Sequence, residues 1–212
     1  AGCHPDGRDD GHVWREFRNT WSREAAHFRA GPSLAFGQEP QPYGVARQTP
    51  MLAGRVTPIG PYGWHAESPT LIHRIRAGFQ LHRADLLATD GGTLQNRAAP
   101  LAEYVRTGLV APAREARDLD EDEQKGKALF ESPKTRCVTC HVVKSEYTDR
   151  STTPLRGFRV LKYFEEDPRK DYKVPSLLYV GGTGPYYHDG SEATLDGLMD
   201  HNLDRMGHTT HL

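Results

Sequence analysis

The distribution of apolar and polar residues along this chain is typical of helices rather than strands. Apolar residues are interspersed with polar ones in residues 71–87 and 195–206, and both segments are predicted to be helices. Each segment directly follows a threonine, Thr70 or Thr194, whose side chain can cap a helix. No stretch alternates strictly between apolar and polar residues, so we expect few and short strands.

A third helix is expected just before a pair of cysteines. The segment DEDEQKGKALFESPKTR opens with an acidic first turn and continues to the apolar residues Leu129 and Phe130. Pro133 then interrupts the pattern and predicts a loop. The third helix and its loop therefore lead directly into Cys137.

The chain divides into two parts of similar length. Residues 111–124, with the sequence APAREARDLDEDEQ, suit a connection between the two parts. The 15 prolines and 21 glycines fit long irregular loops. We therefore expect a mostly α fold with an N-terminal domain over residues 1–115 and a C-terminal domain over residues 116–212.

An internal repeat supports this division. Residues 49–71 contain TPML and then GPYGWHAESPTL, and residues 174–195 contain VPSL and then GPYYHDGSEATL. Alignment of the two copies without gaps pairs Trp64 with His188, and His82 with Met206. Each copy lies downstream of a Cys-His pair, so the chain resembles two copies of one unit.

The composition limits the kinds of molecule that this chain is expected to bind. Apolar residues make up 36% of the chain, which predicts a thin core that a large apolar cofactor could complete. The 27 basic and 28 acidic residues nearly cancel, so nothing points to nucleic acid or an anionic membrane. No apolar run reaches the roughly 18 residues of a membrane-spanning helix. No signal peptide is recognised, so we expect a mature chain or a fragment.

The strongest motif is CVTCH at residues 137–141. Cys-x-x-Cys-His is the attachment signal for c-type haem, in which two thioethers reach the porphyrin vinyl groups and the histidine binds the iron. The alternatives are a redox dithiol and half of a zinc site. No second CxxC or HxxxH lies nearby, and a helix precedes the motif where a thioredoxin-like site would have a strand.

The first four residues, AGCH, match the end of a second such motif. We interpret His4 as the proximal ligand of a second haem, on a chain that begins just inside CxxCH. The alternatives are a single thioether through Cys3 and an ordinary surface Cys-His pair. Met206 is the natural sixth ligand of the haem at His141, with Met51 and Met199 as competitors. Because Met199 precedes Met206 by about two helical turns, the two methionines could share a face.

These stretches resemble the bacterial di-haem cytochrome c peroxidase and MauG superfamily over nearly the whole chain. The stretches that carry the resemblance are AGCHPDGRDDG, RQTPML, GPYGW, CVTCH, YKVPSL and GPYYHDGSEATL. The resemblance implies two cytochrome c-like domains with long loops, each around one c-type haem. It also implies that the chain lacks the helix before its first haem motif and the family's C-terminal closing helix, which another chain or further sequence would supply.

The resemblance also implies roles for individual residues. Trp64 matches the tryptophan that aids electron transfer between the haems, although it could instead be a core aromatic residue. A calcium ion between the domains would be held by Gln48, Thr183 and Pro185. Gln48 stands where the family usually has asparagine, and an amide oxygen remains a suitable ligand for a hard cation.

The sequence departs from the family around the N-terminal haem. No histidine occupies the matching place in FGQEPQPYGVARQTP, and no clear equivalents of the family's distal Glu and Gln follow Trp64. Peroxide chemistry needs an acid–base group within hydrogen-bond reach. The candidates are His82 and Glu67, and His82 could instead bind the iron.

The expected function is peroxidase-like electron transfer outside the cytoplasm, where haem c is attached. An electron donor such as a small cytochrome c or a cupredoxin would reduce the haem at His141, and electrons would pass by Trp64 to the haem at His4, which reduces hydrogen peroxide. The alternatives are MauG-like oxidation of a partner protein and an electron-transfer subunit of a larger cytochrome assembly. A periplasmic or extracellular location and a homodimer or further chain are part of this expectation.

Overall fold

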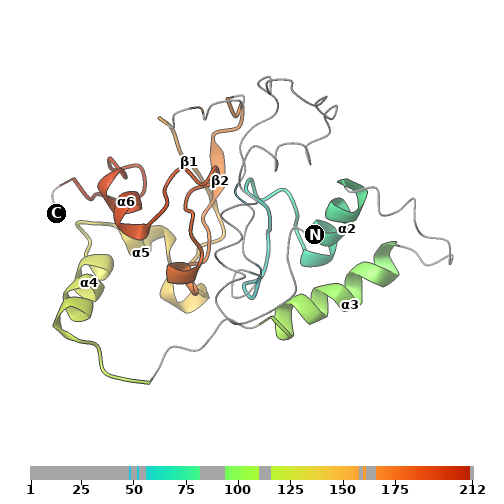
Figure 1. The fold of residues 1–212 in the computed structure, drawn as a ribbon, viewed down its shortest axis with the longest axis horizontal. Coiled ribbons are helices and arrows are strands. Elements are labelled where there is room, and N and C mark those ends of the chain that lie inside the picture. The colour runs from blue at the N-terminus through green and yellow to red at the C-terminus, as the bar shows by residue number, and fades with distance from the viewer. Residues whose placement is uncertain are drawn as a thin grey trace, which may run out of the picture.

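Helices form most of the regular structure in the parts of the chain that the computed structural model describes, which are residues 48, 52, 56–81, 94–109, 116–157, 160 and 166–210. Two short strands are the other regular elements there (Figure 1). The elements follow in the order α2 (Leu71–Leu81), α3 (Leu94–Thr107), α4 (Glu121–Glu131), α5 (Cys137–Cys140), η3 (Val143–Ser145), β1 (Thr152–Pro154), β2 (Asp171–Lys173), η4 (Val180–Gly182) and α6 (Leu195–Asp200). The predicted mostly α class is confirmed for these ranges.

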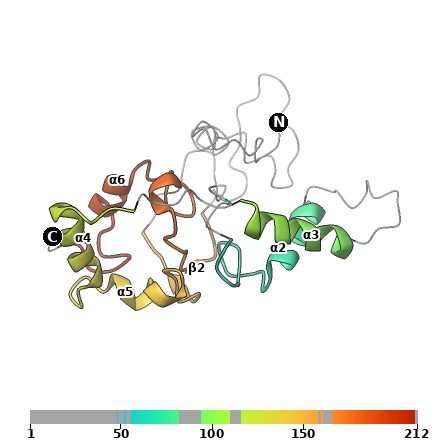
Figure 2. The same ribbon diagram turned by 90° about the horizontal axis from the view of Figure 1, so that it is seen from below.

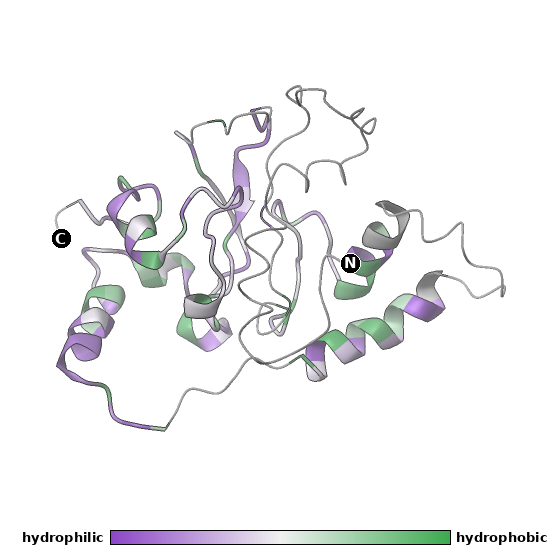
Figure 3. Cartoon of the chain, viewed as in Figure 1, coloured by the Kyte–Doolittle hydropathy of each residue, from purple (hydrophilic) through white to green (hydrophobic). Residues whose placement is uncertain are grey.

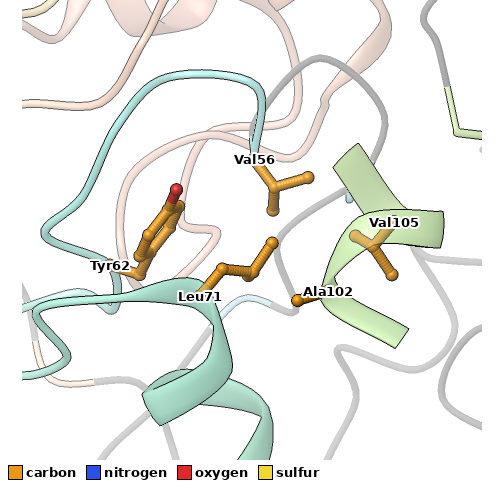
Figure 4. Close-up of a cluster of buried hydrophobic side chains, with 5 residues drawn as sticks. All are labelled: Val56, Tyr62, Leu71, Ala102 and Val105. Atoms are coloured by element: carbon orange, nitrogen blue, oxygen red, sulfur yellow. The ribbon is translucent and has the colours of Figure 1, made fainter. Parts of the chain in front are cut away.

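The main apolar cluster lies where α2, α3 and the loop before α2 meet. Its buried members are drawn in Figure 4: Val56, Tyr62, Leu71, Ala102 and Val105. Thr70 caps α2, because its hydroxyl accepts a hydrogen bond of 3.1 Å from the backbone N–H of His73. The helix is described as far as Leu81, and its predicted continuation to residue 87 lies outside the described residues.

Helix α4 begins with a reciprocal capping box. The Asp120 carboxylate accepts from the Glu123 backbone N–H at 2.9 Å, and the Glu123 carboxylate accepts from the Asp120 backbone N–H at 3.0 Å. The helix therefore starts at Glu121, so residues 121–124 are helical rather than part of the connection that we expected over residues 111–124. A local cap that satisfies two backbone donors explains this difference.

The internal repeat has a structural counterpart in two GPY turns, which we define as residues 60–69 and 184–193. The first turn is closed by an isolated antiparallel bridge between Tyr62 and Ser68. The second turn is closed at the equivalent positions by Tyr186 and Glu192. The Gly-Pro peptide bond that opens each turn is cis.

Helix α6 is shorter than predicted. The Thr194 hydroxyl caps it by accepting from the Gly197 backbone N–H at 3.0 Å, as expected. The helix ends at Asp200, so Met206 lies in the loop that follows and shares no helix face with Met199. The loop is stabilised instead by side-chain hydrogen bonds that are described below.

Strands β1 and β2 pair antiparallel, with Thr153 opposite Tyr172. The first GPY turn contacts β2 through backbone atoms, because the N–H of Lys173 donates to the carbonyl of Trp64 at 2.8 Å. This pair of three-residue strands confirms the expectation of few and short strands within the described ranges. It also brings the two halves of the sequence into direct contact.

The helices of the described chain carry both hydrophilic and hydrophobic residues, as Figure 3 shows for α3 and α4. None of the helices in the described ranges has both the length and the apolar character needed to cross a bilayer. Helices α4, α5 and α6 gather in one part of the structure and the α2–α3 pair lies in another, as both views show (Figures 1 and 2).

Candidate functional site

The CxxCH motif occupies the short helix α5 and the residue that follows it. Cys137 and Cys140 lie about one turn apart, are partly buried, and are not bonded to any cysteine of the described residues. Burial, followed by the negative charge of Asp149, raises the pKa of the Cys140 thiol. Within the described ranges, no three His, Cys, Asp or Glu side chains are arranged to hold a metal ion.

The ring of His141 is oriented by the chain that follows it. Its backbone N–H donates to the Cys137 carbonyl at 3.0 Å, and its Nδ1 lies 2.9 Å from the carbonyl of Tyr147. A carbonyl can only accept, so Nδ1 carries the proton and Nε2 presents a lone pair. This is the tautomer that an iron-binding histidine needs.

Met206 is positioned by Asn202, one of the most deeply buried polar side chains among the described residues. The Asn202 carbonyl oxygen accepts from the Met206 backbone N–H at 2.8 Å. Its amide nitrogen donates to the carbonyls of Met206 and Gly207, at 3.3 and 3.2 Å, and to the Thr209 hydroxyl at 2.8 Å. One side chain therefore determines the path of the Met206 loop, residues 202–209.

The Met206 loop lies against the segment that carries the haem motif. The backbone N–H of His208 donates to the carbonyl of Thr135 at 2.8 Å. A Cβ placed on Gly207 would come within 2.6 Å of that carbonyl and 3.6 Å of the Cys137 sulfur. The loop thus brings Met206 into the neighbourhood of CxxCH, where the sequence predicted the sixth ligand.

Several apolar side chains of the elements that gather near α5 (Figure 1) are only partly covered by protein. Helices α4, α5 and α6 contain no buried residue among the described side chains. Leu129 of α4 is 46% exposed, Met199 of α6 is 45% exposed, and Leu203 of the Met206 loop is 64% exposed. A thin apolar core beside two thiols, a histidine of fixed tautomer and a methionine loop fits a covalently attached haem.

Trp64 lies in the first GPY turn, at the contact with β2. Its indole N–H donates to the Gln48 carbonyl at 3.2 Å, while its own carbonyl accepts from Lys173. The side chain is partly buried. These contacts hold Trp64 where the two halves of the sequence meet, and its relay role stays a prediction.

Two of the three predicted calcium ligands are brought together. The Gln48 side-chain amide nitrogen lies 3.4 Å from the Thr183 carbonyl. The Gln48 backbone N–H donates to the backbone carbonyl of His188 at 2.7 Å. Pro185 is buried two residues further along the same loop. If the Gln48 amide were reversed, its oxygen would face the Thr183 carbonyl, and two such oxygens suit a hard cation.

The remaining predicted site residues are Glu67, His82, Cys3 and His4. Glu67 is exposed and pairs with Arg74 at 2.9 Å, and its other oxygen accepts from the His65 backbone N–H at 3.0 Å. These contacts are those of a surface ion pair, and an acid–base role for Glu67 stays a prediction. His82, Cys3 and His4 lie outside the described residues.

No pattern in the sequence predicted a buried polar cluster between the two GPY turns. His65, Asp167, Tyr172 and His188 come together there, with Tyr172 only 3% exposed. Three separate segments supply these residues, and no local spacing relates them. Contacts between these segments bring the side chains together, among them the backbone hydrogen bond from Lys173 to Trp64 and the contact of His65 Nδ1 with the Asp171 carbonyl at 2.7 Å.

Comparison with known sequences finds two relatives at low identity. The chain is 28% identical over 134 residues to cytochrome c551 peroxidase of Nitrosomonas europaea, covering 54% of this chain and 39% of that protein. It is 26% identical over 132 residues to hydrazine synthase subunit gamma of Kuenenia stuttgartiensis, covering 44% of this chain and 37% of that protein. The match thus spans less than half the length of either curated relative. No family model matches the sequence.

Solved structures share the fold. A MauG-like protein associated with microbial copper homeostasis superposes with a TM-score of 0.55 at 19% identity, over 74% of this chain and 58% of that one. A chain of hydrazine synthase from Kuenenia stuttgartiensis superposes with a TM-score of 0.62 at 17% identity, over 99% of this chain and 84% of that one. The sequence relatives, the shared fold and the motifs quoted above agree with one another: the chain is similar to the di-haem cytochrome c peroxidases and MauG-like proteins.

Proposed function

We propose that this chain is a di-haem c-type cytochrome oxidoreductase that takes electrons from a donor protein and reduces hydrogen peroxide. The main support for this proposal is the arrangement of residues at CxxCH. Nδ1 of His141 donates to the Tyr147 carbonyl at 2.9 Å, and the Met206 loop contacts the segment before the motif at Thr135. When bound, a haem supplies an iron that takes up and passes on single electrons, and that reacts with peroxide where its sixth position is open.

The residues around His141 suit electron transfer. A thioether from Met206 would close the sixth position and favour a relatively high reduction potential. The Asn202 contacts described above would hold that thioether in place. A small donor protein, such as a cytochrome c or a cupredoxin, would supply electrons to a haem held by these residues.

The second haem belongs to His4, with a thioether from Cys3. Trp64 would assist electron transfer toward it, and His82 or Glu67 would move protons at its distal side. Reduction of one peroxide molecule consumes two electrons and two protons and yields two water molecules. We propose a location in the periplasm or outside the cell. The two domains would cover residues 1–115 and 116–212. A calcium ion would be held by Gln48, Thr183 and Pro185.

A second candidate is an electron-transfer subunit of a larger cytochrome assembly. The likeness to a subunit of hydrazine synthase, both in sequence and in fold, favours this alternative. MauG-like oxidation of a partner protein is a third candidate, which the fold likeness to a MauG-like protein supports.

Steady-state turnover distinguishes these candidates. The exported holoprotein is mixed with a reduced small cytochrome c, and the oxidation of that donor is followed with and without hydrogen peroxide. Peroxide-dependent oxidation that disappears in a His141→Ala variant supports the peroxidase. A holoprotein that exchanges electrons with the donor but never consumes peroxide would contradict it in favour of the electron-transfer subunit.

A further inference from the structure

Tyr172 lies between the two GPY turns and is almost completely buried. Its ring stacks on that of His188, with ring centroids 4.0 Å apart and an interplanar angle of 27°. The ring of His65 lies 4.8 Å away. His65 belongs to the first GPY turn and His188 to the second, so Tyr172 contacts both copies of the repeat.

The phenol of Tyr172 faces a buried carboxylate. Its hydroxyl donates to Asp167 Oδ2 at 2.8 Å. The same oxygen lies 3.5 Å from Nε2 of His65, and the side chains of His65 and Asp167 are only 6% and 9% exposed. His65 is held from its other side, because its Nδ1 lies 2.7 Å from the Asp171 carbonyl. The carboxylate therefore has a fixed place beside the phenol.

This partner distinguishes Tyr172 from Tyr62, a second buried tyrosine, which belongs to the apolar cluster at α2 and α3. The Tyr62 hydroxyl donates to the Pro58 carbonyl at 2.7 Å. A backbone carbonyl accepts a hydrogen bond but cannot take the proton itself, whereas a carboxylate can. Loss of an electron makes a phenol strongly acidic, so a base at hydrogen-bond distance is what a readily oxidised tyrosine requires.

We propose that Tyr172 is a redox-active residue that gives one electron to an oxidised haem of this chain and its proton to Asp167. In this step the phenolic O–H bond breaks, a new O–H bond forms on Asp167 Oδ2, and the ring becomes a neutral tyrosyl radical. An oxidised haem held by this chain would take up that electron. Return of an electron to the ring and of the proton from Asp167 restores the starting state.

The position of Tyr172 suits a relay next to Trp64. Lys173, the neighbour of Tyr172 in β2, donates its backbone N–H to the Trp64 carbonyl at 2.8 Å. The Trp64 indole N–H donates to the backbone carbonyl of Gln48, and the Gln48 backbone N–H donates to the backbone carbonyl of His188. Tyr172, His188 and Trp64 are thus held in one connected structure between the halves of the chain. The proposal rests on the proposed function only for the haem as the physiological oxidant.

The test oxidises the holoprotein with light and without peroxide. Photoexcited ruthenium tris-bipyridyl with persulfate as electron acceptor generates a strong one-electron oxidant, and electron paramagnetic resonance of frozen samples detects radicals. We expect a tyrosyl spectrum that narrows when the tyrosines are ring-deuterated. Tyr172→Phe should lose this signal, and Tyr62→Phe, the matched control, should keep it.

Variants at position 167 separate a redox role from a structural one. Asp167→Asn retains the shape of the side chain but removes the base, so the radical yield should fall while the circular dichroism spectrum stays unchanged. Asp167→Glu keeps the base and should restore the yield. A full tyrosyl signal in Tyr172→Phe, or an undiminished yield in folded Asp167→Asn, would overturn the proposal.

Because light supplies the oxidant, this experiment separates the two proposals. A radical at Tyr172 without peroxide turnover would contradict only the proposed peroxidase function. Peroxide turnover in a protein that forms no radical under illumination would contradict only the role of Tyr172.

Discussion

At the scale of single residues, side-chain hydrogen bonds determine where the candidate iron ligands lie. The Tyr147 carbonyl orients His141, and Asn202 holds the backbone on both sides of the Met206 side chain. Neither contact involves a sequence-adjacent partner. Changes at the supporting residues should therefore alter ligation as strongly as changes at the ligands.

Replacement of Asn202 tests this directly. Asn202→Ala leaves the Met206 N–H and two loop carbonyls without their partner, and a buried polar group left unsatisfied costs about 1 to 3 kcal/mol. We expect a lower midpoint of urea unfolding and loss of the absorption band of thioether-ligated ferric haem. Met206→Leu should lose the same band, and Met199→Leu should keep it. Persistence of the band in Asn202→Ala would show that the loop needs no such support.

Asp204 gives a prediction about pH. Hydrogen bonds from the backbone N–H and hydroxyl of Thr210, and from the backbone N–H of Thr209, lower the pKa of Asp204 from 3.8 to about 2. A carboxyl with a lowered pKa in the folded state stabilises it above the unfolded pKa, and this contribution is lost as pH falls through the folded value.

The wild type should therefore be more stable than Asp204→Asn at neutral pH, and the difference should shrink as pH falls from about 4 to about 2. Urea midpoints measured at several pH values check this. Asp122→Asn, which removes an exposed carboxylate that pairs with Lys125 at the surface, is the control. A difference that stays constant over this range would contradict the assignment.

At the scale of elements, caps and close backbone approaches fix the structure around CxxCH. The capping box at Asp120 starts α4, the helix that leads into the motif. Asp120→Ala should destabilise the protein by about 1 kcal/mol, because one N-cap side chain contributes that much. Asp122→Ala, in the first turn of the same helix but outside the cap, should cost less in the same urea titration. Equal effects of the two changes would argue against the cap.

Two glycines of the C-terminal half make a matched pair. Gly207 has φ +75°, and an added Cβ would meet the Thr135 carbonyl at 2.6 Å, so Gly207→Ala should displace the Met206 loop from the haem motif. Gly126 lies in α4 with open space around it, and Gly126→Ala should stabilise the protein by about 0.5 to 1 kcal/mol. Thermal unfolding and the haem spectrum together report both effects. A Gly207→Ala protein with unchanged stability and spectrum would contradict the loop contact.

At the scale of the whole molecule, local signals in the sequence predicted the local structure well. The caps at Thr70 and Thr194, the helix before Cys137 and the repeated GPY turns each depend on a few neighbouring residues. The early end of α6 was missed, because Asn202 bonds to a loop that no helical pattern encodes. The acidic first turn of α4 was predicted, and only the expected connection was too long, because its last four residues belong to this helix.

Contacts between the halves lay beyond the reach of sequence patterns. The cluster at Tyr172 joins residues from three segments, and its geometry depends on contacts between them, such as the hydrogen bond from Lys173 to Trp64 and the stacking of Tyr172 on His188. The family resemblance supplied Trp64 and the Gln48–Thr183 pair as candidates, and the pair is in contact. Physical reasoning on the sequence alone would have found neither.

The number of haems covalently bound to each chain tests the central claim most directly. The pyridine haemochrome assay on protein exported through a cytochrome c maturation pathway, with the chain concentration from amino-acid analysis, gives this ratio. The account predicts two haems per chain, of which the one at His141 disappears in a Cys137→Ala, Cys140→Ala double variant. A wild-type ratio of one or zero would contradict it.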